Sequence, residues 1–328
     1  MKNSRLIYSN FIKYIASVKL ARGIGFFLRY LFLRIKIFIL KILYKKIIFL
    51  ICGPGLGDTL ILSPIARRLR EDGNKVIFVA QTRLSLNVAK RVPDFDDVIM
   101  WDPRLASIAK IINASFWNQI ILKKKTKNLI DLCAEIISCG DIKDKTIKYR
   151  LSTGEERFAL RYKKLFGDYL VFHTDCRKPE SYNLKLWPEE YWQRLIDMQK
   201  LPIVIIGTRI ETGYSFKNCI DLRNKTTIHQ AAALIKFSRL LVGIVSVSVW
   251  FGNAFDKEAV IIDGGWEPPI LTQYEKSHHL FTTIECSPCL RGDNYCPYDL
   301  KCMKMIAPES VNRKIIEVLG EKEGIGSL

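Results

Sequence analysis

The stretch KKIIFLICGPGLGDTLILSPIARRLREDG, residues 45–73, decides the fold of this chain. Its apolar run, residues 47–51, has the pattern of a buried strand, and three glycines follow within five positions. Apolar residues then recur at helical spacing as far as Gly73. A strand, a tight turn and a helix are the first unit of a parallel α/β sheet, and Asp58 lies at the turn.

The same alternation of strands and helices continues along the chain. Apolar runs predict strands over 75–81, 96–102, 169–175, 201–207, 240–246 and 258–265. Helical spacing predicts helices over 83–92, 105–125, 154–167, 183–200, 228–239 and 249–255, whereas 127–137 fits a strand or a helix. With 328 residues the chain has room for two domains. We therefore expect an α/β fold of two Rossmann-like, doubly wound domains that face a cleft.

Basic residues are concentrated at the N-terminus. Net charge is +18, but residues 1–46 contain eleven Lys and Arg and no Asp or Glu. Nucleic-acid binding would instead favour basic residues spread over a folded face, so we expect no nucleic-acid partner. Nine cysteines, without a cleavable secretion signal, indicate a reducing compartment.

Residues 24–43, IGFFLRYLFLRIKIFILKIL, could enter a membrane or lie on it. Their fourteen Leu, Ile and Phe favour insertion by roughly 4 to 8 kcal/mol, whereas four cations oppose it by roughly 10 to 14 kcal/mol. Apolar residues follow one face of a helical wheel and the cations the other. This pattern predicts an amphipathic helix on an anionic membrane surface; a helix packed on the protein's own core is the alternative.

The glycine turn lacks the spacing of the common phosphate-binding loops. Glycines 53, 55 and 57 form G-x-G-x-G rather than G-x-G-x-x-G, and the second strand ends at Gln81 without an acid. No Lys-Ser or Lys-Thr follows, which excludes a Walker loop. Asp58 either caps a helix or points into the crevice at the strand ends; Ser63 before Pro64 is a rival cap.

Five segments together resemble glycosyltransferase family 9, the bacterial ADP-heptose heptosyltransferases. They are GLGDTLILSPIARRLRE, KLWPEEYW, VIIGTRIE, DLRNKTTIHQAAALIKFSRLLVG and ECSPCLRGDNYCPYDLKCMKMIAPESV, and they follow the family's order between about 47 and 319. The resemblance implies a GT-B fold and an inverting sugar transfer that requires no catalytic metal. We expect four parts: from the amphipathic pattern, a membrane-associating helix at 1–46; and from the resemblance, an acceptor-side domain at 47–167, a nucleotide-sugar domain at 168–308, and a helix that crosses back with its tail at 309–328.

The resemblance also assigns roles to individual residues. Asp58 would be the general base, with Gly55, Gly57 and Thr59 forming the acceptor-side turn around it. Lys185 would neutralise the leaving diphosphate, and Glu211 would contact the ribose. Lys185 and Glu211 each have an alternative interpretation without a functional role. A lysine is ordinarily a solvated surface residue, and a glutamate often lies at the start of a helix.

One motif of the family is altered in this chain. Where the family has Asp-Thr/Ser-Gly-Pro-x-His, the sequence IVSVSVWFGNAF places Val245, Val247, Ser248 and Trp250, and only Ser246 remains. We expect the amides from Ser246 onward to receive phosphate oxygens still, although a glycine-dependent turn cannot be copied with valine. Trp250 would stack where the imidazole stood. The protein is then an active transferase, or else a membrane-associated scaffold that no longer turns over.

The remaining candidates are cysteines and cleft residues. The cysteines 286, 289, 296 and 302 have a spacing that can wrap a structural zinc or iron, or they are reduced, buried thiols. His173 and Asp175 follow a strand end, and Trp266 and Glu267 belong to an expected cleft loop; no partner is evident for the other histidines. The expected partners are an ADP-heptose-like donor and a lipid-linked or surface-glycan acceptor, at the cytoplasmic face of a bacterial inner membrane.

Overall fold

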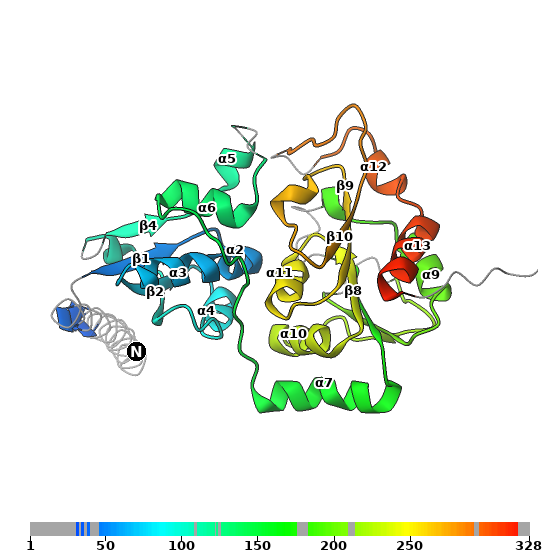
Figure 1. Cartoon of the computed structure of the whole chain (residues 1–328), viewed down its shortest axis with the longest axis horizontal. Coiled ribbons are helices and arrows are strands. Elements are labelled where there is room, and N and C mark those ends of the chain that lie inside the picture. Colours follow the sequence, from blue (N-terminus) through cyan, green and yellow to red (C-terminus); the bar gives the residue numbers. More distant parts are fainter. Residues whose placement is uncertain are drawn as a thin grey trace, which may run out of the picture.

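The computed structural model describes residues 31–32, 34–35, 38–39, 46–107, 110–121, 123, 126–175, 183–208, 214–291 and 295–320. They form two α/β halves that lie side by side, each built on a parallel sheet (Figure 1). The halves meet through α2 and α11, helices that follow the first strand of one sheet and a central strand of the other. The α/β class and the two-sheet arrangement predicted from the sequence are confirmed.

The first half has a four-stranded sheet in the order β3-β2-β1-β4. Its strands are β1 (Ile47–Ile51), β2 (Lys75–Ala80), β3 (Asp97–Met100) and β4 (Ile111–Asn113). Its helices are α2 (Leu56–Leu60), α3 (Leu62–Glu71), α4 (Arg83–Ala89), α5 (Trp117–Ile121) and α6 (Leu129–Ile137), with a 3-10 turn at Pro103–Ser107. Because every pair is parallel, the carboxyl ends of all four strands lie at one edge, next to the glycine turn.

The second half has a six-stranded sheet in the order β10-β9-β8-β5-β6-β7. The strands are β5 (Leu170–His173), β6 (Ile203–Ile206), β7 (Ile220–Asp221), β8 (Leu240–Ile244), β9 (Ala259–Gly264) and β10 (Ser277–Phe281). The helices are α7 (Thr153–Phe166), which leads in, α9 (Glu189–Asp197), α10 (Ile228–Phe237), α11 (Val247–Ala254), α12 (Lys301–Lys304) and α13 (Pro308–Leu319), with 3-10 turns at Asn183–Lys185 and Pro269–Leu271. The strand order reverses direction between β5 and β8, which is where open α/β sheets bind ligands.

The helix predicted over 105–125 is wrong in part. Its middle forms β4, because Ile111 and Ile112 pair with Phe49 and Leu50 of β1 and extend the sheet. Tertiary pairing thus overrides the helical spacing there. The open alternative at 127–137 is a helix, since the Asn128 side chain accepts the Ile130 amide at 3.1 Å as an N-cap. Strands β7 and β10 were not predicted.

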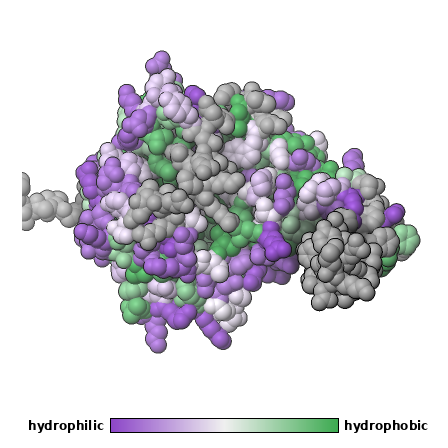
Figure 2. Space-filling model, turned by 180° about the vertical axis from the view of Figure 1, so that it is seen from behind, coloured by the Kyte–Doolittle hydropathy of each residue, from purple (hydrophilic) through white to green (hydrophobic). Residues whose placement is uncertain are grey.

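The described part of the N-terminal segment is helical at Leu31, Phe32, Ile35, Phe38 and Ile39, all with exposed side chains. Within the residues that the structure describes, no helix has both the length and the apolar character needed to cross a bilayer. Seen from behind the view of Figure 1, the described surface of the molecule mixes hydrophilic and hydrophobic side chains (Figure 2).

Contacts between the halves involve several elements. The Asn253 side chain accepts the Ile147 amide at 2.7 Å, and the Asn128 side chain donates to the Gln273 carbonyl at 3.1 Å. Helix α7 packs along α10 of the second half, as Figure 1 also shows. Helix α13 lies against α9 and β9 (Figure 1), so its described residues stay on the second half instead of crossing back as the resemblance implied. Residues 321–328 lie outside the described chain.

Candidate active site at the domain boundary

The glycine turn after β1 is shaped around the Asp58 carboxylate. A Cβ placed on Gly53 would collide with Asp58 Oδ2, and one on Gly55 would lie 3.1 Å from it. Neither glycine has a positive φ, so the turn needs glycine for space and not for conformation. Thr59 is fully buried and donates its hydroxyl to the Gly55 carbonyl at 3.2 Å, which makes it a support of the turn.

The Asp58 side chain is buried and hydrogen-bonded, with 8% of its surface exposed. Burial raises its pKa, while hydrogen bonds from the Trp117 indole and the Gly55 amide, and the charge of Lys185, lower it. Trp117 Nε1 donates to Oδ2 at 3.4 Å. The Gly55 contact resembles the carboxylate half of a capping box, so Asp58 supports the start of α2 and also lies at the domain boundary. Ser63 does not cap; it donates to Asp94 Oδ2 at 2.5 Å.

The second half brings a buried cation to the same place. Lys185 Nζ lies 2.5 Å from Glu267 Oε1 and 4.5 Å from the centre of the Trp266 ring. Lys185 is 8% exposed, which excludes the solvated-surface reading of this lysine. The charges of Lys185 and Glu267 both act on the pKa of Asp58, so the three groups share one electrostatic environment.

Aromatic rings join the two halves around Asp58. The rings of Trp117, from the first half, and Trp266, from the second, have centroids 5.9 Å apart. A Cβ on Gly57 would lie 2.9 Å from the Trp250 ring, so the Gly57 backbone can pack against this indole only because residue 57 is glycine. Trp250 is buried against that turn, and its predicted stacking on a donor stays a prediction.

The altered motif forms the N-terminus of α11. Ser246 is the N-cap, and its hydroxyl accepts the Ser248 amide at 3.3 Å. Val247 begins the helix, and none of residues 245–248 has a positive φ, so the turn is made without glycine. His173 Nδ1 lies 2.7 Å from Ser246 Oγ and 2.9 Å from Ser248 Oγ. Burial lowers the pKa of His173 to about 4, so its imidazole is neutral at pH 7.

Other predicted candidates lie elsewhere. Glu211 falls outside the described residues. Cys286, Cys289 and Cys296 are partly exposed and Cys302 is buried, and no group of three or more potential ligands converges among the described residues. Burial together with the charges of Cys286 and Cys296 raises the pKa of Cys289, and burial together with the charges of Cys289 and Cys296 raises that of Cys302, so the four thiols lie in one neighbourhood. The predicted structural metal stays a prediction.

Three features were missed by sequence reasoning. Trp117 lies in the segment misassigned as one long helix, and nothing local marks it as a partner of Asp58. His279 was left without a partner, but it pairs with the buried Asp263 at 2.9 Å, and burial raises the pKa of that carboxyl to about 6. Similarly, His229 Nδ1 lies 2.7 Å from the Tyr149 hydroxyl across the domain boundary.

Two parallel α/β halves, with a carboxylate from one and a lysine from the other at their boundary, define a two-domain α/β protein of the GT-B type.

Three glycosyltransferases are among the solved structures that have this fold. The glycosyl transferase family 9 protein from Veillonella parvula DSM 2008 matches with a TM-score of 0.65 and 16% identity, over 85% of this chain and 98% of that one. The E. coli ADP-heptose LPS heptosyltransferase II gives 0.62 and 14%, over 83% and 98%. The iron-containing dodecameric glycosyltransferase TibC from enterotoxigenic E. coli H10407 gives 0.61 and 14%, over 83% and 79%. The GT-B fold is thus confirmed.

Neither a protein-family model nor a curated protein sequence matches the chain.

Proposed function

We propose that the protein is a family 9 glycosyltransferase that moves a sugar, with inversion, from a nucleotide-sugar to a lipid-linked or surface-glycan acceptor. The observation that carries the proposal is the convergence of Asp58 and Lys185 from opposite halves of a GT-B fold. A buried carboxylate beside a buried cation is suited to proton transfer next to a departing anion. The similar E. coli enzyme is described as an ADP-heptose heptosyltransferase, which supports an ADP-heptose-like donor.

The transfer would be a single displacement. The acceptor hydroxyl loses its proton to Asp58 as its oxygen attacks the anomeric carbon from the face opposite the leaving group. The bond from that carbon to the phosphate oxygen breaks, and its electron pair leaves with the diphosphate. Lys185 and the amides at the N-terminus of α11 would stabilise the added negative charge. No metal has a step in this scheme.

Glu267 sets a condition on donor binding. Its carboxylate holds Lys185 Nζ at 2.5 Å inside the protein, where both groups are buried. A diphosphate must therefore share the ammonium with Glu267 or displace that carboxylate. We propose that Trp266, which stacks under the ammonium, keeps Lys185 in place during this exchange.

The test is transfer and donor hydrolysis across ADP- and UDP-sugars, with Asp58→Asn as the critical variant. We expect the substitution to lower kcat by a factor of about 100 or more, because it removes the general base and leaves the volume unchanged. Asp72→Asn, at the end of α3, is the matched control and should keep full activity. NMR of the product should show an inverted anomeric configuration; retention would contradict the single displacement.

A non-catalytic scaffold remains the second candidate, and the altered sequence at the start of α11 favours it. It would be supported if no donor gives turnover that depends on Asp58.

The proposed location is a membrane surface on the cytoplasmic side, reached through the basic segment 1–46. The exposed apolar side chains of its described residues support this. Deletion of 1–46 should abolish flotation with vesicles containing phosphatidylglycerol, and unchanged flotation would contradict the proposal.

A further inference from the structure

Two segments of the second half meet at the buried ion pair between Lys185 and Glu267. Lys185 ends the 3-10 turn at Asn183–Lys185, and Glu267 follows β9 through Gly265 and Trp266. The partners are 82 residues apart in the chain, so tertiary contacts must hold the two segments side by side. A third stretch, residues 287–291 and 300–306, contacts both of them, and we call it the bridging segment.

The first part of the bridging segment runs beside Trp266. The Cys289 amide donates to the Gly265 carbonyl at 3.0 Å. The Leu290 amide donates to the Trp266 carbonyl at the same distance. The buried Trp266 indole in turn donates to the Arg291 carbonyl at 3.0 Å. Both the backbone and the ring of Trp266 are therefore held by the main chain of the bridging segment.

Two glycines before Trp266 allow this close approach. A Cβ on Gly265 would collide with Ser287 Oγ and lie 2.9 Å from Cys302 Cβ. Gly264 has a φ of +64°, and a Cβ there would collide with Met303 Sδ. Helix α12 accordingly packs on β9 (Figure 1). A side chain at either glycine would push the bridging segment away from Trp266.

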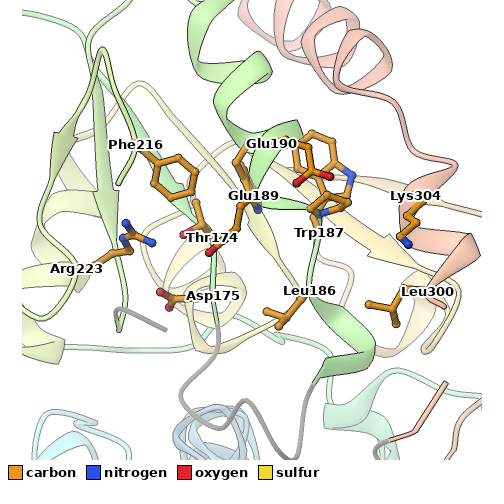
Figure 3. Close-up of a pocket in the computed structure, with 12 residues that line it drawn as sticks. Thr174, Asp175, Leu186, Trp187, Glu189, Glu190, Phe216, Arg223, Leu300 and Lys304 are labelled. Atoms are coloured by element: carbon orange, nitrogen blue, oxygen red, sulfur yellow. The ribbon is translucent and has the colours of Figure 1, made fainter. Parts of the chain in front are cut away.

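The second part of the bridging segment holds the stretch that carries Lys185. The Trp187 indole, two residues further on, donates to the Ile306 carbonyl at 2.9 Å, and both residues are buried in one apolar core. Leu300 of the bridging segment and Leu186 line the same pocket, which Figure 3 shows. One stretch of chain is thus hydrogen-bonded to the neighbours of both partners in the ion pair.

We propose that the bridging segment positions Lys185: by holding Trp266 on one side and Trp187 on the other, it sets where the ammonium lies. This role rests on the proposed function, in which Lys185 stabilises the leaving diphosphate. The Trp266 ring lies 4.5 Å from the ammonium, so a movement of the ring carries the cation with it. A misplacement of about 1 Å near a reacting centre can slow a reaction roughly 100-fold. Trp266 and Gly265 are therefore positioning residues for transfer.

The first test is Trp266→Phe, which keeps an aromatic ring and removes the N–H group that reaches Arg291. Tyr169→Phe is the matched control at the amino end of β5, because the buried Tyr169 hydroxyl also donates to a main-chain carbonyl, that of Leu234 at 2.9 Å. We expect both variants to lose similar stability. Assayed well below their unfolding temperatures, only Trp266→Phe should lower kcat, by about tenfold.

The pKa of Asp58 gives a readout that needs no turnover. The charge of Lys185 lowers this pKa, and that of Glu267 raises it by less. Movement of the ion pair away from Asp58 should therefore raise the pKa in Trp266→Phe, by about 0.5 or more, as measured by carboxyl ¹³C NMR. Tyr169→Phe should leave it unchanged. An unchanged pKa in Trp266→Phe would overturn the proposal.

A double variant shows whether the effect passes through Lys185. In a Lys185→Gln chain, Trp266→Phe should cause no further rise in the pKa of Asp58. A rise that persists there would show that the effect passes through Trp117, whose ring centre lies 5.9 Å from that of Trp266, and would also overturn the proposal. The other titratable neighbours of Asp58 are the buried thiols Cys52 and Cys133 of the first half, which no variant changes.

The second test approaches Trp266 from the bridging segment. Gly265→Ala would place a methyl group against Ser287 Oγ and should raise the pKa of Asp58 as Trp266→Phe does. Ser287→Ala alone should have no effect, because Ser287 Oγ has no hydrogen-bond partner within the described chain. Added to Gly265→Ala, it removes the closest contact and should restore part of the parent pKa. An unchanged pKa in Gly265→Ala would contradict the proposal, and if that variant does not fold, Trp266→Phe decides.

The two proposals fail separately. If the parent chain transfers no sugar, the proposed function fails, while the carboxyl signal of Asp58 still tests the position of Lys185. If transfer occurs but the pKa of Asp58 ignores Trp266 and Gly265, only the positioning role fails.

Discussion

At the scale of single residues, glycines 53 and 55 show that a small side chain can be required by the residue it faces. Both have ordinary backbone angles, and the space that they leave is filled by the carboxylate of Asp58. This explains why the sequence has closely spaced glycines without the spacing of a phosphate loop.

We expect Gly53→Ala to lower transfer activity about tenfold or more, because its methyl group would collide with Asp58 Oδ2 and move the carboxylate. Gly154→Ala is the matched control: its Cβ would meet nothing closer than Ser152 Oγ at 3.9 Å. Kinetics and thermal unfolding of both variants check this. An active Gly53→Ala would show that the position of Asp58 is not critical.

His173 and Asp175 should affect the pH dependence of stability in opposite directions. The pKa of His173 falls to about 4 on burial, so the unfolded chain binds more protons between pH 4 and 6.5 and stability rises with pH there. The pKa of Asp175 rises to about 7, so the folded chain binds more protons from pH 4 to 7 and stability falls with pH.

The two single variants separate these effects. In Asp175→Asn the free energy of unfolding should rise more steeply between pH 4.5 and 6.5 than in the parent, whereas in His173→Gln it should rise less or fall. The difference between the variants should be roughly 2 to 4 kcal/mol over this range. Urea denaturation at the two pH values measures it, and equal slopes would contradict the assigned pKa directions.

At the scale of elements, α5 matters because it delivers the Trp117 indole to Asp58. The helix begins at Trp117 directly after the β4 connection, so the pairing of β4 with β1 fixes where the indole lies. The contact could not be predicted, since it depends on the same tertiary pairing that made the helix prediction wrong at Ile111–Asn113.

Trp117→Phe keeps an aromatic ring and removes the N–H group that lowers the pKa of Asp58. That pKa should therefore rise, and the acidic limb of the kcat/KM profile should move to higher pH. Trp101→Phe, at a partly exposed tryptophan after β3, is the control and should leave the profile unchanged. Carboxyl ¹³C NMR of Asp58 gives the same pKa without turnover. An unchanged value would show that the 3.4 Å contact is too weak to matter.

Local patterns were sufficient wherever an element's own residues determine it. The strand at 47–51 and the helix at 228–237 have clear apolar spacing or caps, whereas the helix predicted over 249–255 begins two residues earlier, at Val247. Lys185 was located through its motif, but its burial against Glu267 depends on a loop about eighty residues away. Cysteine spacing alone suggested a metal; the four thiols lie in one neighbourhood, but no group of three or more potential ligands among the described residues is placed to hold an ion.

At the scale of the whole molecule, the closeness of Gly57 and Trp250 sets how near the two halves can come. A methyl group on residue 57 would lie 2.9 Å from the indole, which is too close without a shift of one half. The ring is buried and has little room to turn. The distance between the halves is therefore coupled to a single Cβ position.

Gly57→Ala should increase the radius of gyration measured by small-angle X-ray scattering and make the chain between the halves more sensitive to protease. Gly252→Ala is the matched control, because its Cβ would collide with Tyr274 within the second half. It should lower stability and leave the radius of gyration unchanged. The same radius for Gly57→Ala and the parent would mean that the indole yields without moving either half.

The packing of α7 on α10 determines where any relative motion can occur. The chain is still attached to the first half at Arg150, whose amide donates to the Arg91 carbonyl at 2.8 Å, while α7 begins at Thr153 and travels with the second half. A rotation of one half about residues 151–152 would therefore break the Ile147–Asn253 and Tyr149–His229 contacts and strain the Arg91–Glu155 ion pair. Because this connection is so short, we expect the two halves to open by a rigid-body rotation about it, and not to move independently as domains on a flexible linker do.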